Sequence, residues 1–131
     1  MIKSYYFLFA GALALIGSVG HALTGHQSVL SAMEPGGPRH AVFLFLHQTT
    51  WFMLASSIVL VGGSFLSQMK RVRPIAAFIA LIFAGNFVFF VVTSLMVNRE
   101  ALANLLPQLV FFVLYVGLIV AGILRGGSQR P

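Results

Sequence analysis

Residues 20–51 read GHALTGHQSVLSAMEPGGPRHAVFLFLHQTTW and join two long apolar runs. The segment Glu34–Pro38 in the middle of this stretch, EPGGP, is expected to end a helix, because proline and glycine interrupt helical structure. The apolar runs on either side are therefore expected to form two helices that turn back on each other. The same stretch contains all four histidines of the chain, His21, His26, His40 and His47.

Outward from this stretch the chain is almost uniformly apolar. Of its 131 residues, 59% are hydrophobic and 8% are charged, whereas about a quarter of a soluble domain is charged. The mean hydropathy of +0.97 is that of a membrane protein, so the lipid bilayer is the expected partner. The absence of cysteine excludes disulfides, thiolate metal sites and iron–sulfur clusters. No glycine-rich phosphate loop or basic–aromatic patch is present, so nucleotides and nucleic acids are not expected partners.

Four apolar runs use nearly the whole chain, and each is long enough to cross a hydrocarbon core of about 30 Å. We predict helices over residues 4–24, 40–65, 74–97 and 107–124. Pro74 and Pro107 then lie where a helix starts, a position that tolerates proline. Because the connections are short, the expected fold is a single all-α domain over residues 1–131. It is a four-helix transmembrane bundle in up-down-up-down order.

Several polar and small residues within these runs predict how the helices pack. Gly11, Ala14, Ser18 and His21 lie three or four residues apart on one helix face, and small residues let a neighbouring helix approach closely. His21 is therefore expected to point into the bundle, since an imidazole facing lipid would be costly.

Three further side chains in the apolar runs are assigned roles from their depth and spacing. Asn86 and Thr93 are seven residues apart on one face, and interhelical hydrogen bonding is their expected role. Trp51 lies too deep for an interfacial aromatic belt, so a packing role is expected for it.

The distribution of basic residues predicts the orientation in the membrane. Six of them fall on the side of both termini, namely Lys3, Lys70, Arg71, Arg73, Arg125 and Arg130. The other side has Arg39 and Arg99, with Glu34 and Glu100 beside them. The excess of Lys and Arg on cytoplasmic loops of membrane proteins predicts that both termini are cytoplasmic. We therefore expect a multi-pass protein in the bacterial inner (cytoplasmic) membrane.

This orientation places all four histidines in the outer half of the membrane or at its outer surface. At 1.5 Å of rise per residue, His26 and His40 are expected near the outer interface, with His21 and His47 in a deeper layer. Imidazole is the commonest metal-binding side chain and suits copper, zinc and iron. The cluster therefore predicts a transition-metal site formed by His21, His26, His40 and His47. Alternatively, His21 and His47 from facing helices could hold a b-type haem.

A structural interpretation stands beside this one. The protein could be a non-catalytic accessory or structural subunit of a larger membrane complex, or a homo-oligomer, with histidines that serve only helix packing. A pH-responsive channel or transporter is a third, weaker interpretation, because histidines titrate near neutral pH. Neither a paired set of carboxylates nor an HExxH motif supports catalysis, and the sequence leaves enzymatic activity open.

Overall fold

The computed structural model describes residues 2–31, 33, 35–97 and 106–125, and these are helical apart from short connections. The elements are α1 (Tyr5–Gly20), the π-helical turn η1 (His21–Gly25), α2 (His26–Ser31), α3 (Gly37–Phe65), α4 (Met69–Val97) and α6 (Leu106–Arg125). Together α1, η1 and α2 form one continuous helical segment, and with α3, α4 and α6 they give four segments long and apolar enough to cross a membrane. The all-helical, multi-pass class predicted from composition is confirmed.

Two helices start earlier than the sequence pattern predicts. Helix α3 begins at Gly37, after Gly36 adopts a φ of 153° that favours glycine. Helix α4 begins at Met69, so that Pro74 lies inside the helix and not at its start. The proline removes only the hydrogen bond to the carbonyl of Lys70, in the first turn.

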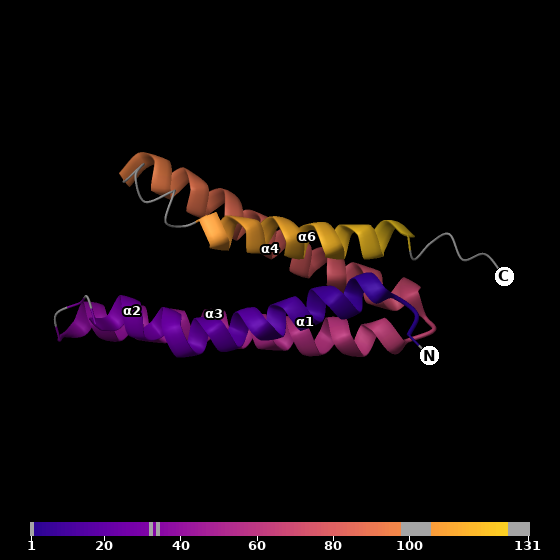
Figure 1. Ribbon diagram of the computed structural model, residues 1–131, viewed down its shortest axis with the longest axis horizontal. Coiled ribbons are helices and arrows are strands. Elements are labelled where there is room, and N and C mark those ends of the chain that lie inside the picture. The colour runs from indigo at the N-terminus through magenta and orange to yellow at the C-terminus, as the bar shows by residue number, and fades with distance from the viewer. Residues whose placement is uncertain (1, 32, 34, 98–105, 126–131) are drawn as a thin grey trace.

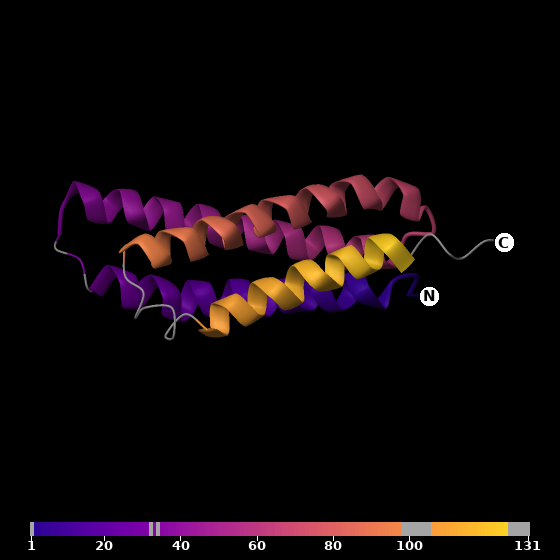
Figure 2. The ribbon, with the colours of Figure 1, turned by 90° about the horizontal axis from the view of Figure 1, so that it is seen from above.

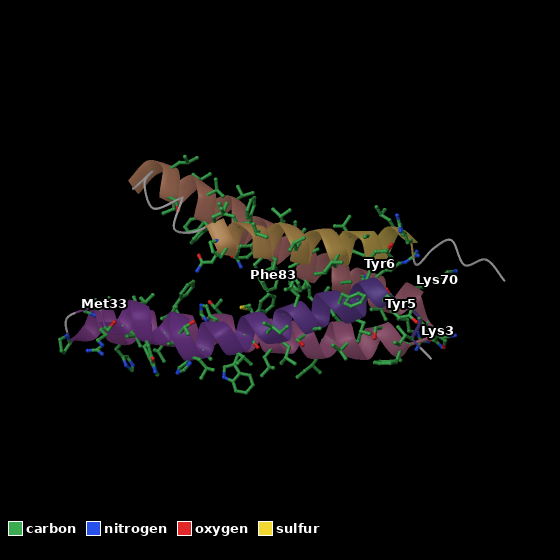
Figure 3. The ribbon with its side chains drawn as sticks, in the orientation of Figure 1. Lys3, Tyr5, Tyr6, Met33, Lys70 and Phe83 are labelled. Atoms are coloured by element: carbon green, nitrogen blue, oxygen red, sulfur yellow. The ribbon has the colours of Figure 1, made fainter. Side chains whose placement is uncertain are left out.

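The helices form two pairs that lie one over the other, α1 with α3 and α4 with α6 (Figure 1), and α6 packs on α1 as well as on α4. Successive helices run antiparallel, so α1 and α6 bring the two chain termini to the same end of the bundle (Figures 1 and 2). Lys3 and Lys70 lie at this end and Met33 lies at the opposite one (Figure 3). We call these the termini end and the α2 end.

The core lies between the two pairs, towards the termini end. Its largest fully buried apolar side chains are Tyr115, Phe7, Leu60 and Ile119. Phe83 of α4 lies between the pairs (Figure 3), with its ring centroid 5.5 Å from that of Phe52 on α3 and 4.6 Å from that of Tyr115 on α6. In a bilayer, such van der Waals packing and interhelical hydrogen bonds hold helices together.

The α1–α3 pair is the closest contact in the bundle, and small residues of α1 make it possible. The predicted stripe is confirmed, because Gly11, Ala14 and Ser18 are all buried. A Cβ atom on Gly11 would lie 2.6 Å from Cγ2 of Val61 and 3.0 Å from the carbonyl oxygen of Ser57. The two backbones therefore approach more closely than any side chain at residue 11 would permit.

Hydrogen bonds also hold α1 and α3 together. The hydroxyl of Ser57 on α3 donates to the carbonyl of Gly11 over 2.7 Å. At the termini end, the backbone N–H groups of Lys3 and Ser4 donate to the carbonyl of Ser64 over 2.7 and 3.1 Å. Ser4 also caps α1, because its hydroxyl accepts from the N–H of Phe7. The start of the chain is thus tied to the end of α3.

One packing prediction is wrong. Trp51 is 69% exposed, because its position on α3 points away from both α1 and α4. In a membrane this side chain faces lipid or another protein. Four charged residues used to predict the orientation, Glu34, Arg99, Glu100 and Arg130, lie outside the described residues.

The close approach at Gly11 gives a testable expectation for stability. Gly11→Ala forces the α1 and α3 backbones apart, and overpacking of this kind costs about 1–3 kcal/mol. We expect the free energy of unfolding, measured by denaturant titration in mixed micelles, to fall by this amount. The matched control is Gly20→Ala on the same helix, where a Cβ meets nothing within 4 Å. Equal effects of the two substitutions would contradict the close contact.

Candidate histidine site

Three of the four histidines lie together towards the α2 end of the bundle. The ring centroid of His26 is 5.2 Å from that of His21 and 4.6 Å from that of His47. The ring of Phe43 lies 4.2 Å from that of His47. His26 is buried, with 6% of its surface exposed, whereas His21 is half-buried and His47 is exposed. We call His21, His26 and His47 the histidine cluster.

The hydroxyl of Thr50 on α3 joins two members of the histidine cluster. Its oxygen lies 2.8 Å from Nδ1 of His21 and 3.2 Å from Nε2 of His26. The same hydroxyl donates its only proton to the carbonyl of Leu46 over 3.0 Å. Since a hydroxyl has one proton and two lone pairs, Thr50 accepts a hydrogen bond from each imidazole.

This arrangement favours one tautomer of each ring, given a Thr50 proton directed at the carbonyl of Leu46. In its neutral form His21 is protonated at Nδ1, and His26 is protonated at Nε2. A neutral imidazole has one N–H donor and one nitrogen with a free lone pair. Nε2 of His21 and Nδ1 of His26 are therefore left as unprotonated nitrogens. Unprotonated nitrogen is the form of imidazole that binds metal ions.

The π-helical turn η1 brings His21 and His26 to one face. Residues five apart in an α-helix differ by about 140° around the axis, so an α-helix would point these two rings in different directions. In η1 the N–H of His26 bonds the carbonyl of His21, and the wider turn lets both rings reach Thr50. The hydroxyl of Thr24 donates to the carbonyl of Gly20 over 2.7 Å, and such back-bonding disturbs the α-helical ladder locally.

The composition of the histidine cluster differs from the two layers that the sequence predicts. His21 and His47 were expected to share the deeper layer, and both belong to the cluster. His26 was expected to lie with His40 at the interface, but it contacts His21 and His47. His40 is exposed in the first turns of α3, and its backbone N–H donates to the carbonyl of Gly36. The difference arises because the helical segment continues through η1 and α2 to Ser31, whereas the prediction ended the first helix at residue 24 and placed His26 in the connection.

The described residues do not form a ready multidentate metal site. Among residues 2–31, 33, 35–97 and 106–125, no group of three or more His, Cys, Asp or Glu side chains is arranged to hold a metal ion. Glu34, the acidic residue in the same stretch of sequence as the histidines, lies outside these residues. The cluster thus consists of two imidazoles held by one hydroxyl and the exposed ring of His47 in contact with that of His26.

The sequence analysis missed the hydroxyl side chains that organise the site. Thr50, Ser57 and Ser64 recur every seven residues along α3, so they share one face. The hydroxyl of Thr50 is hydrogen-bonded to His21 and His26, and the hydroxyl of Ser57 donates to the carbonyl of Gly11. The seven-residue spacing of hydroxyls was visible in the sequence and marks the face of α3 that meets α1.

Comparisons with known proteins assign neither a family nor a function to the chain. No protein-family model matches the chain, and no curated protein or solved structure shows a significant similarity to it. The site is therefore interpreted from its own geometry.

The shared hydroxyl predicts a specific pattern of stability changes. Thr50→Val keeps the shape of the side chain but leaves two imidazole N–H groups without their acceptor, and each unsatisfied buried donor costs about 1–3 kcal/mol. We expect a loss of at least that size in the free energy of unfolding in mixed micelles. Thr49→Val is the matched control, because the hydroxyl of Thr49 bonds only the carbonyl of Phe45 in its own helix.

A double-mutant cycle checks the cause of the loss. In a His21→Ala background, Thr50→Val should cost measurably less than in the wild-type chain, since one of the two orphaned groups has gone. Additive losses from His21→Ala and Thr50→Val would show that the hydrogen bond contributes nothing.

Proposed function

We propose that this protein binds a transition-metal ion at the histidine cluster of its membrane-embedded bundle. The observation that carries the proposal is the convergence of His21 and His26 on one hydroxyl, that of Thr50. This convergence leaves an unprotonated nitrogen on each ring. Metal-binding histidines typically donate their other N–H to an oxygen that fixes the tautomer and orientation of the ring. Thr50 holds His21 and His26 in this way.

The chemistry of the surroundings limits the choice of ion. The described residues supply neither a thiolate nor a carboxylate near the cluster, and the chain has no cysteine at all. Calcium and magnesium prefer oxygen ligands, whereas imidazole suits copper, zinc and iron. The proposed ion is therefore copper, zinc or iron.

The arrangement of the rings favours a single ion over a haem. A bis-imidazole haem needs two rings on opposite sides of a flat macrocycle. The ring of His26 contacts both His21 and His47, so it takes up the space next to the two rings expected to hold a haem. A small ion instead needs only a change of side-chain rotamer. The exposed ring of His47 has room to turn and supply a third nitrogen, with water completing the coordination.

The π-helical turn favours a binding role over simple packing. One histidine bonded to Thr50 would suffice to tie α1 to α3. Two imidazoles aligned by η1, one of which also contacts a third, exceed what packing requires. Single π-helical turns are rare and occur frequently at functional sites, because their poorer backbone geometry has to be offset by another gain.

The basic residues support an orientation for this site. Lys3, Lys70, Arg71, Arg73 and Arg125 all belong to the termini end of the bundle, and the histidine cluster lies towards the α2 end. The excess of positive charge on cytoplasmic loops supports a cytoplasmic location of the termini end. The cluster would then exchange its ion with the outer side of the membrane.

Metal binding is measurable on the purified protein. We expect about one copper, zinc or iron ion per chain by elemental analysis after purification in mild detergent, or on titration with the free ion. Thr50→Val should weaken binding by about 10- to 100-fold, as changes to residues that orient ligands do. His21→Ala and His26→Ala should weaken it at least as much.

His40→Ala is the matched control, because His40 is exposed and lies outside the histidine cluster. Its affinity should equal that of the wild-type chain. A chain that takes up no stoichiometric metal from copper, zinc or iron solutions would overturn the proposal. Combined with a destabilised Thr50→Val variant, that result would instead support the alternative of an accessory or structural subunit.

The orientation is testable with single cysteines, since the native chain has none. Gly37→Cys, at the start of α3, should react with a membrane-impermeant maleimide in intact cells. Ser67→Cys, in the connection between α3 and α4, should react only after the membrane is permeabilised. The reverse pattern would place the histidine cluster on the cytoplasmic side.

A further inference from the structure

Helix α4 is only partly covered by the rest of the chain. Its first half packs on α3, where a Cβ on Gly63 would meet Val72 and where Phe83 stacks on Phe52. Beyond Phe83, the ring contacts of α4 are made to α6, where Phe87 meets Phe112. Towards the α2 end α4 diverges from α3 (Figure 1). One side of its second half therefore lacks a neighbouring helix among the described residues.

The uncovered side of α4 has the spacing of a helix–helix interface. Its residues alternate at intervals of four and three, namely Ile82, Asn86, Phe89, Thr93 and Met96. We call these five residues the α4 seam. Repeats of this kind lie along one face and pack against a second helix at a small crossing angle. Phe89 is 74% exposed and Met96 is 82% exposed.

Asn86 indicates that the α4 seam faces protein and not lipid. It lies near the middle of α4 and is exposed, and no hydrogen bond joins its carboxamide to another described residue. A carboxamide in hydrocarbon is costly unless its donors and acceptor are satisfied. Acyl chains supply neither donor nor acceptor. The partner of the seam must therefore present polar atoms at the depth of Asn86.

We infer that the α4 seam binds the α4 seam of a second copy of this chain, forming a symmetric dimer. A carboxamide is both donor and acceptor, so Asn86 is complementary to Asn86 of another copy. Copies inserted in the same orientation place their α4 helices parallel, with equal residues at equal depth. A two-fold axis along the membrane normal then brings Asn86 opposite its own equivalent. In parallel helix pairs, a single asparagine at such a position specifies the register.

The flanking residues of the seam fit the same partner. Ile82 and Phe89 lie one turn on either side of Asn86, and they would enclose the paired carboxamides in an apolar environment. Thr93, two turns from Asn86 on the same face, has a hydroxyl that is compatible with lipid or protein contact. The seam lies on α4, so the dimer leaves the histidine cluster on η1, α2 and α3 free.

Cysteine cross-linking in native membranes tests the geometry. Single cysteines at Ile82→Cys and Phe89→Cys should form disulfide-linked dimers on mild oxidation, because equal seam positions face each other across the two-fold axis. Val88→Cys is the control, since Val88 is exposed on a different face of the same turn. Cross-linking at Val88 as efficient as at Phe89 would show random collisions and would overturn the dimer.

A second measurement tests the carboxamide itself. Asn86→Leu should weaken dimerisation by about tenfold, measured by energy transfer between labelled copies in liposomes. Thr93→Val should have a smaller effect and serves as a variant that retains the carboxamide. An Asn86→Leu chain that dimerises as well as the wild type would contradict the pairing. A wild-type chain that is monomeric in liposomes but binds a different membrane protein would also overturn it.

Discussion

The rest of the structure depends on the close contact between α1 and α3, which one face of α3 makes possible. On that face the hydroxyl of Thr50 bonds His21 and His26 and the hydroxyl of Ser57 bonds Gly11, and at the end of α3 the backbone carbonyl of Ser64 accepts from Lys3 and Ser4. In a bilayer there is no hydrophobic driving force between helices, so short backbone distances and satisfied polar groups decide which helices pair. Gly11 permits the distance and the three oxygens supply the bonds. Helices α4 and α6 pack on this pair through contacts such as Phe83 with Phe52 and Gly122 with Phe7.

The histidine cluster follows from this contact together with one local irregularity. An uninterrupted α-helix from Tyr5 to Ser31 would direct His21 and His26 to different sides, leaving one ring towards lipid or the headgroups. The turn η1 redirects His26 inward, where it is buried. The same register between α1 and α3 that sets Ser57 against Gly11 sets Thr50 against His21. A shift of one turn along either helix would separate all of these pairs, so the geometry of the cluster and the stability of the helix pair are linked.

Much of the fold could be predicted because a bilayer limits the possible structures. Four long apolar runs must be helices, since only internally hydrogen-bonded segments cross hydrocarbon, and the small residues of α1 correctly indicated its packed face. That His21 and His47 lie at a similar height in the bundle could be predicted because an α-helix has a fixed rise per residue. The position of His26 could not, because nothing in a five-residue spacing signals that a turn will widen. The exposure of Trp51 was also missed, because depth in the membrane does not determine which way a side chain faces.

The two helix pairs differ in how they satisfy their polar groups, and this difference explains where the chain has room for partners. The α1–α3 pair holds the hydroxyls of Thr50 and Ser57 and one nitrogen each of His21 and His26 in internal hydrogen bonds. Helix α4 instead carries Asn86 in the middle of an apolar span with no internal partner among the described residues. If residue 86 faced lipid, leucine at this position would make the protein more stable than asparagine does. The asparagine therefore supports a helix that reaches its full stability only when it is paired with another helix in an assembly. The histidine cluster and the α4 seam thus belong to separate helices, and a dimer through α4 would leave the contacts that hold the cluster unchanged.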